Sequence, residues 1–201
     1  MRLDIPFSTA CERNKQVILA KICDLLSNRK SIIEIGSGTG QHAIFFAKNL
    51  PNLNWYTSDI KENLETITLR IKECPSPNLH LPFELEIGVH ALPKNTFDGI
   101  FTANTFHILP MDRIRQLMGE VSKSLPKGGV FLVYGPFHLK GKLSSESSTV
   151  FDHNLRRVDP LMGIRELEEM IEIGDHFSLV MTERIQMPTN NQLLVFFKNI
   201  A

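Results

Sequence analysis

The stretch "SIIEIGSGTGQHAIFFAKNL", residues 31–50, decides the fold because a glycine-rich turn joins a strand pattern to a helix pattern. Its first residues are mostly β-branched and apolar around one carboxylate, Glu34, and its second half carries apolar side chains at helical spacing. Gly36, Gly38 and Gly40 lie between the two halves. Because glycine tolerates positive φ and lets a ligand approach backbone N–H groups, the stretch predicts a ligand site where a strand turns into a helix.

Apolar runs alternate with helical segments along the rest of the chain, as in parallel sheets covered on both faces. The predicted strands are 31–35, 54–58, 83–87, 97–103, 130–134, 177–186 and 193–198. The predicted helices are 12–27, 41–49, 62–73, 111–124 and 163–173. The link between the last two strands is too short for a crossover helix, so these strands must form an antiparallel hairpin. The sequence therefore predicts a three-layer, Rossmann-like α/β fold with a seven-stranded, mostly parallel sheet and a C-terminal antiparallel hairpin.

Length and composition indicate an ordinary globular protein. The 201 residues fit one domain, 1–201, in which residues 1–30 form an N-terminal helical segment and residues 136–160, which lack a predicted strand, are a candidate lid. Lys plus Arg and Asp plus Glu both number 22, and this zero net charge argues against a nucleic-acid partner. The sequence has no apolar run of signal-peptide or membrane-span length, so we expect a cytoplasmic protein.

The three cysteines, Cys11, Cys23 and Cys74, form neither a CxxC pair nor an even set. This pattern favours reduced, buried thiols over a disulfide framework or a structural zinc site. The histidines also lack metal-ligand spacing, so no metal is expected.

The glycine spacing and two carboxylates distinguish between nucleotide cofactors. Dinucleotide-binding folds favour G-x-G-x-x-G, but here the third glycine comes one position early and Gln41 takes its place. Glu34 would repel a diphosphate and attract a cation, and Asp59 ends the second predicted strand, where a carboxylate can accept hydrogen bonds from both ribose hydroxyls. Adenosine combined with a cation describes S-adenosylmethionine, with S-adenosylhomocysteine as its product. The alternatives are a helix N-cap for Asp59 and a nicotinamide dinucleotide for the loop.

Several motifs carry a family resemblance. "EIGSGTG", "FDGIFTANTFH" and "LPKGG" resemble the class I S-adenosylmethionine-dependent methyltransferases. "ERNK", "GSGTGQH", "YGPF", "FDHNLR", "DPLMGIRELE" and "MPTNNQLLVF" are similar, from Ser8 to Phe197, to the methyltransferase-like family filed as domain of unknown function 938. The resemblance implies methyl transfer and leaves the acceptor unassigned.

The resemblance also implies a set of cofactor-binding residues. The methionine portion would lie against Glu34, Gly36, Ser37, Gly38, Thr39 and Gly40. Asp59 would hold the ribose and Glu86 would lie beside the adenine, although Glu86 is equally consistent with an exposed charge at a strand end.

The carboxyl ends of parallel strands meet at one edge of a sheet, so the segments that follow them should form the acceptor site. The candidate catalytic residues are His107, Tyr134 and Asn104, and the candidate substrate-binding residues are Asn14, Phe137, Asn190 and Asn191. His107 has an intrinsic pKa suited to a base, but it is also consistent with a structural role. His42, just past the glycine loop, could touch the cofactor or the substrate, but a solvated face of the second predicted helix is the simpler expectation.

The fourth strand ends in "ANTF" and lacks the Asp/Asn-Pro-Pro-aromatic signature of DNA amino-methylating enzymes. Together with the zero net charge, this favours a small-molecule acceptor. The alternative to an enzyme is a catalytically silent protein that binds S-adenosylmethionine for interaction or sensing.

Overall fold

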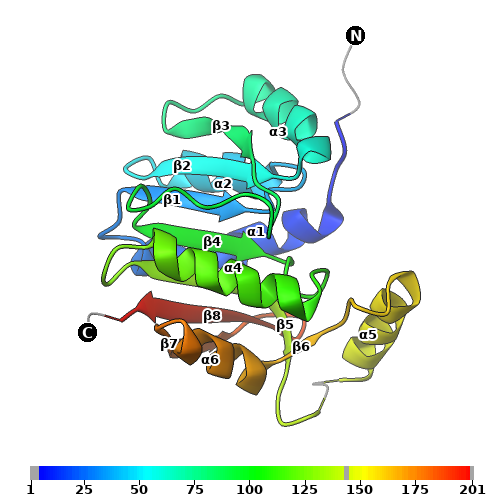
Figure 1. The fold of residues 1–201 in the computed structure, drawn as a ribbon. Helices are drawn as coiled ribbons and strands as arrows, with labels where there is room; N and C mark the ends of the chain where they lie inside the picture. Colours follow the sequence, from blue (N-terminus) through cyan, green and yellow to red (C-terminus); the bar gives the residue numbers. More distant parts are fainter. Residues whose placement is uncertain (1–4, 143–144, 200–201) are drawn as a thin grey trace.

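The central sheet has the strand order β3-β2-β1-β4-β5-β8-β7, with a short β6 paired to β5. The structure is a computed structural model that describes residues 5–142 and 145–199 (Figure 1). The predicted domain 1–201, N-terminal segment 1–30 and candidate lid 136–160 each include a few residues outside the described ones, namely 1–4, 143–144 and 200–201.

The strands are β1 Ser31–Ile35, β2 Asn54–Asp59, β3 Leu79–Glu84, β4 Gly99–Ala103, β5 Val130–His138, β6 Arg165–Glu166, β7 Leu179–Gln186 and β8 Asn191–Lys198. The helices are α1 Thr9–Leu25, α2 Gln41–Asn49, α3 Lys61–Glu73, α4 Met111–Ser124, α5 Glu146–Val158 and α6 Leu167–His176.

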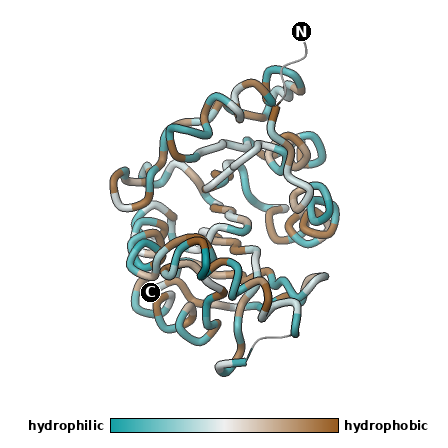
Figure 2. The backbone as a smooth tube through the Cα atoms, turned by 90° about the vertical axis from the view of Figure 1, so that its right-hand side faces the viewer, coloured by the Kyte–Doolittle hydropathy of each residue, from teal (hydrophilic) through white to brown (hydrophobic). Residues whose placement is uncertain are grey.

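Helices cover both faces of the sheet, which confirms the predicted three-layer α/β architecture (Figure 1). Successive residues of a strand point to opposite faces, so Ile32 of β1 packs among residues of α1, α2 and α3, while Ile33 packs among residues of α4 and α6. In Figure 2 hydrophobic and hydrophilic residues alternate along the helices, as expected for helices with one apolar face.

The C-terminal hairpin of β7 and β8 is confirmed, and its second strand lies inside the sheet. β8 lies between β5 and β7 and is antiparallel to both. Residues 192–196 of β8 are all buried, whereas β7 is largely exposed along its length. The continuous apolar run of β8 therefore marks a strand covered on both faces, and the more polar β7 forms the edge.

The third strand spans Leu79–Glu84 and not the predicted 83–87. The proline at position 82 argues against a strand in the sequence, but β3 is an edge strand, where the missing N–H can be tolerated. As a result, Glu86 lies in the turn that follows the strand.

The candidate lid contains more regular structure than the sequence indicates. β5 continues into it as far as His138, and the two-residue β6, just beyond the segment, adds an eighth strand by pairing Arg165 with Phe137. Between β5 and β6 lies helix α5, capped by the Ser145 hydroxyl, which accepts a hydrogen bond from the Ser148 N–H at 3.2 Å. This segment stands beside the carboxyl edge of the sheet (Figure 1). Among the described residues, no helix is long and apolar enough to cross a membrane.

Candidate functional site

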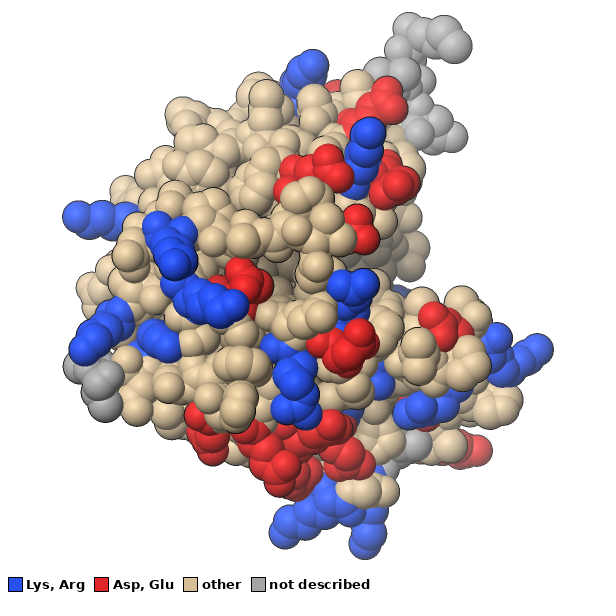
Figure 3. Space-filling model, viewed as in Figure 1, with Lys and Arg blue, Asp and Glu red and all other residues tan. Residues whose placement is uncertain are grey.

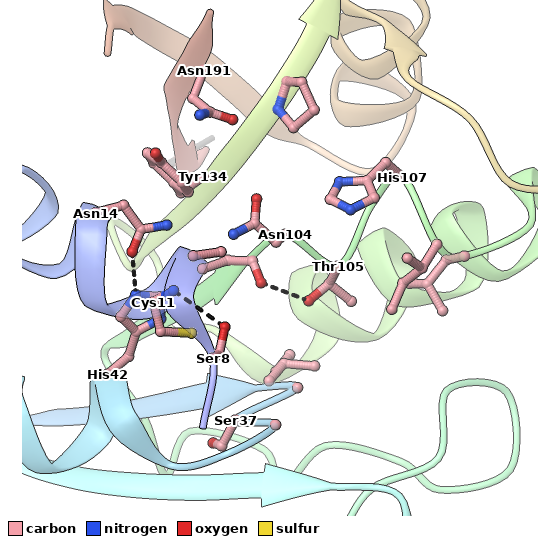
Figure 4. A pocket seen from close by; sticks show the side chains of 18 of the residues that line it. Ser8, Cys11, Asn14, Ser37, His42, Asn104, Thr105, His107, Tyr134 and Asn191 are labelled. Carbon is pink, nitrogen blue, oxygen red and sulfur yellow. Dashed lines mark hydrogen bonds between the residues drawn. The ribbon is translucent and has the colours of Figure 1, made fainter. Parts of the chain in front are cut away.

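A cavity of about 970 Å³ opens at the carboxyl ends of the parallel strands. Its walls come from the start of α1, from the loops that follow β1, β2, β3, β4 and β7, from the end of β5 and from α5. In Figure 4, Ser37 of the glycine loop lies at the bottom of the view and Asn191 at the top, with Asn104 and Tyr134 between them. The topology thus brings the glycine loop and most of the predicted acceptor residues to one site.

The glycine loop needs glycine at two positions for different reasons. Gly36 has φ +72°, and a Cβ there would lie 3.0 Å from the Thr105 Oγ1, so the loop packs tightly against the segment after β4. Gly38 has φ +56° and no neighbouring atom within 4 Å of its would-be Cβ. Because Gly38 also lines the cavity, its backbone is open to a ligand.

Glu34 lies beneath the loop and does not line the cavity. Its Oε2 accepts hydrogen bonds from Trp55 Nε1 and from Ser37 Oγ, each at 3.2 Å. Burial raises the pKa of this carboxyl to about 8, against the opposing effect of the two donors. In the structure the carboxyl group thus supports the loop from below, and its predicted contact with a cofactor stays a prediction. Gly40 also lies outside the cavity wall, as the N-cap of α2.

Asp59 ends β2, lines the cavity and accepts three hydrogen bonds. Its Oδ2 accepts from the Gly38 N–H at 2.6 Å, and its Oδ1 accepts from the Ile60 N–H at 2.8 Å and from Asn63 Nδ2 at 2.9 Å. The carboxylate thus connects the glycine loop to the start of α3, and its binding of a ribose stays a prediction. The N-cap residue of α3 itself is Ile60.

Glu86 is exposed and lines the cavity from the turn after β3. Three apolar residues that the sequence did not single out also line the cavity, namely Ile60, Leu85 and Ile87. They lie within three residues of the ends of β2 and β3, so the strand-end argument that singled out Asp59 applies to them as well.

Asn104 and His107 follow β4 and line the other end of the cavity. Asn104 adopts φ +58°, an uncommon value for a residue with a side chain, and its N–H donates to the Tyr134 carbonyl at 2.8 Å. His107 is 8% exposed, and its ring meets that of Phe151 from α5 edge-on, with 5.3 Å between centroids. Burial, aided by the charge of Arg165, lowers the pKa of His107 to about 4, so the imidazole is neutral near pH 7.

Tyr134 of β5 and the β7–β8 turn complete this end of the cavity. Burial raises the pKa of the Tyr134 phenol, and both Asn190 and Asn191 line the wall. Asn190 Nδ2 also donates to the Ser145 hydroxyl at 2.8 Å, which ties the turn to the start of α5. Phe137 does not line the cavity: it is 3% exposed and packs in the core against the α4 and α6 side of the sheet.

Charged side chains of both signs are present on the face of the molecule in Figure 3, with the acidic ones gathered over α6. Within residues 5–142 and 145–199, no three His, Cys, Asp or Glu side chains lie together as metal ligands.

Comparison with models of protein families shows the family of the chain, because one model matches residues 5–198. The chain belongs to the family described as protein of unknown function DUF938. This confirms the family resemblance of its motifs.

Solved structures share the fold of the DUF938 chain at low sequence identity. The S-adenosylmethionine-dependent methyltransferase SibL, in its apo form, matches with a TM-score of 0.81 and 16% identity over 94% of this chain and 56% of its own. The mitomycin 7-O-methyltransferase MmcR matches with a TM-score of 0.84 and 12% identity over 94% and 54%. PigF, solved with SAH, matches with a TM-score of 0.79 and 14% identity over 90% and 55%. The DUF938 chain thus has the fold of these methyltransferases and spans little more than half of their length.

His42 of the DUF938 chain was expected on a solvated face, and this expectation is wrong. The ring is 4% exposed, stacks on Phe46 with 5.2 Å between centroids, and its Nε2 lies 2.7 Å from Asn14 Oδ1. The reason is that α1 packs over the start of α2, where both backbone groups of Ser8 bond with the Gln41 side chain. The local sequence carries no signal of this contact, because its partners lie far apart in the chain.

The expectation of buried cysteines also fails. All three thiols are free, but Cys11 and Cys23 are only partly buried and Cys74 is exposed. Cys11 lines the cavity from α1, and burial raises the pKa of its thiol, so it is protonated near pH 7.

Proposed function

We propose that the DUF938 chain is an S-adenosylmethionine-dependent methyltransferase that acts on a small-molecule acceptor. One observation carries the proposal: a single cavity joins the glycine loop and Asp59 to a neutral polar set formed by Asn104, His107 and Tyr134. The first group suits an adenosine cofactor, and the second suits a small acceptor beside it.

The residues at the loop end fit the cofactor. The open backbone of Gly38 leaves space for a ligand, and the apolar Ile60 and Leu85 offer surfaces for a flat base with Glu86 at its edge. The Asp59 carboxylate has about four lone-pair sites and uses three of them, so a ribose would take the remaining site and compete with the Gly38 N–H for another. When bound, the cofactor would supply an electrophilic methyl group on a sulfonium.

The chain itself would contribute alignment, exclusion of water and a proton acceptor. His107 is neutral near pH 7, so its imidazole can accept a hydrogen bond or a proton from the acceptor. The burial that lowers its pKa also makes it a weak base, which suits an acceptor whose proton is easily lost. Phe151 of α5 stands against the His107 ring and would help to close the site to water.

Calorimetric titration tests the proposal, with S-adenosylmethionine, S-adenosylhomocysteine and NADH as separate ligands. We expect binding of the first two and none of NADH. Asp59→Ala should weaken S-adenosylhomocysteine binding roughly a hundredfold, because two charge-assisted hydrogen bonds to a ribose are lost. His107→Ala should change this affinity by less than about threefold, since His107 lies at the other end of the cavity.

Asp112→Ala, on the exposed first turn of α4, serves as the matched control and should bind like the wild type. Equal losses in the Asp59 and His107 variants would show that the assigned roles are mistaken. Binding of NADH without binding of the sulfonium cofactor would overturn the proposal.

A further inference from the structure

One buried arginine, Arg165 of β6, joins two loops that line the cavity on the side of His107. The residue is 7% exposed and is not part of the cavity wall. Its Nε donates to the Phe106 carbonyl at 3.1 Å, and its Nη2 donates to the carbonyls of Leu109 at 2.5 Å and Leu161 at 2.7 Å. The first two carbonyls belong to the β4–α4 loop and the third to the α5–β6 loop. A single guanidinium therefore ties these two loops together.

The contacts of Arg165 lie on both sides of His107 in the chain, at the carbonyl one position before it and at the carbonyl two positions after it. The His107 carbonyl itself accepts a hydrogen bond from the Gly163 N–H of the α5–β6 loop at 2.9 Å. Met162 and Ile164 of that loop line the cavity, as His107 does. The place of His107 in the cavity wall therefore depends on how the two loops are held.

The arrangement requires the chemistry of arginine. A guanidinium carries five N–H donors in a rigid plane and no acceptor, so one side chain can serve several carbonyls at once. Buried carbonyls need such partners, because water does not reach them. Lysine has a single nitrogen on a flexible stem and does not reproduce this fork. Arg165→Lys would therefore keep the charge of Arg165 and lose its set of contacts.

Arg165 also brings a positive charge close to the His107 ring. Within residues 5–142 and 145–199, its guanidinium forms no ion pair with a carboxylate. The charged groups that influence it are Arg156 and Asp152 of α5, which pair with each other, and Glu169 of α6. Burial and the charge of Arg165 together lower the pKa of His107 to about 4. A proton on His107 would place a second cation near the guanidinium.

We propose that Arg165 is a positioning residue for His107. It fixes the loop that carries His107 against the loop before β6, and its charge repels a proton on the imidazole ring. The use of His107 as a proton acceptor rests on the proposed function, but the contacts of Arg165 do not. If His107 takes a proton from the acceptor, the place of its ring and its neutral form both depend on a residue outside the cavity wall.

Two variants separate the contacts of Arg165 from its charge. Arg165→Met removes both, while Arg165→Lys keeps the charge and loses the planar set of donors. Asn78→Leu is the matched control, because Asn78 is also buried and does not line the cavity. Its Nδ2 likewise donates to three carbonyls, those of Ala47, Leu50 and Leu53. The wild type and the three variants are compared without any ligand.

Amide hydrogen exchange of Gly163 measures how firmly the loops are held, because this buried N–H bonds to the His107 carbonyl. We expect exchange to be about tenfold faster or more in both Arg165 variants and unchanged in Asn78→Leu. Arg165→Lys is the milder change and keeps this readout if Arg165→Met does not fold. Wild-type exchange in Arg165→Lys would overturn the proposal. An equal acceleration in Asn78→Leu would also overturn it, because the effect would then follow overall stability.

NMR titration of the His107 ring measures the effect of the charge, with His107→Gln to assign its signals among the seven histidines. In Arg165→Met, His107 should bind a proton about tenfold more tightly than in the wild type, since the repelling charge is gone. In Arg165→Lys the proton affinity should stay within about threefold of the wild type. A loop that is merely loosened would raise the proton affinity equally in both variants. Such an equal rise, or no change in Arg165→Met, would overturn the proposal.

Neither readout involves the cofactor or an acceptor. Failure of this inference would leave the calorimetric titrations of the proposed function unaffected. Conversely, a chain that did not bind S-adenosylhomocysteine would still show whether Arg165 positions His107. The two failures are therefore distinguishable.

Discussion

Glu34 is a residue that the sequence singles out and that the structure places beneath the glycine loop. Its carboxyl group lies two residues before the first glycine, as in the predicted cofactor motif, but it faces the interior and bonds to Trp55 and Ser37. A carboxyl group in this position stabilises the loop from below. Its ionisation, and not only its presence, then matters to the fold.

The raised pKa of Glu34 predicts a specific pH dependence of stability. The pKa of Glu34 is about 8 in the folded chain, against 4.5 for an ordinary glutamate, so the folded state holds the proton more tightly than the unfolded state does. The stabilisation of the folded state by this tightly held proton is complete below pH 4.5 and is lost as the pH rises through 8. Glu34→Gln cannot ionise and should lack this loss, which we expect to be on the order of a few kcal/mol between pH 5 and 9.

Urea denaturation of both proteins at several pH values between 5 and 9 measures this difference. Glu65→Gln, on an exposed position of α3, is the control and should follow the wild type. Parallel stability curves for the wild type and Glu34→Gln would contradict the assignment of a buried, titrating carboxyl group.

At the scale of elements, the glycine loop and the turn before β5 provide a natural comparison. Gly38 and Gly128 both have positive φ, +56° and +72°, and neither has an atom within 4 Å of its would-be Cβ. Alanine at either position should thus cost about 1 kcal/mol of stability through backbone strain alone. Of the two glycines, only Gly38 lines the cavity. Gly38→Ala alone should therefore also weaken S-adenosylhomocysteine binding, by about tenfold or more, because a close contact between ligand and backbone is lost.

Thermal denaturation and calorimetric titration of the two variants separate strain from binding. Similar losses of affinity in Gly38→Ala and Gly128→Ala would mean that the affinity follows the overall stability of the fold and that Gly38 does not contact the cofactor.

Secondary-structure elements also explain which sequence-based expectations fail. Phe137 was expected at the cavity because β5 was expected to end at position 134, but the strand continues to His138. Its residues alternate between faces, so Phe137 joins Phe131 and Val133 on the side of α4 and α6. A strand extended by four residues thus moves an aromatic side chain from the site to the core.

For the whole molecule, the sequence predicts what depends on local pattern. The glycine turn, the alternation of strands and helices and the convergence of strand ends follow from periodicity and from the geometry of parallel sheets. The burial of His42 and its contact with Asn14 depend on how α1 packs over α2, between residues 28 positions apart. The chain contains no local signal for such long-range packing, so this part of the site becomes visible only in three dimensions.

The cavity joins segments from nearly the whole length of the chain, from Ser8 to Asn191, so a bound ligand should stabilise the molecule as a unit. At a free ligand concentration of 100 times Kd, binding to the folded state alone adds about 2.7 kcal/mol to the free energy of unfolding. We expect S-adenosylhomocysteine to raise the wild-type Tm accordingly, while at the same concentration Asp59→Ala should gain far less. NADH should raise neither Tm. An increase in Tm that is equal in the wild type and in Asp59→Ala would place the ligand outside this cavity, because it would then bind without the carboxylate that connects the glycine loop to α3.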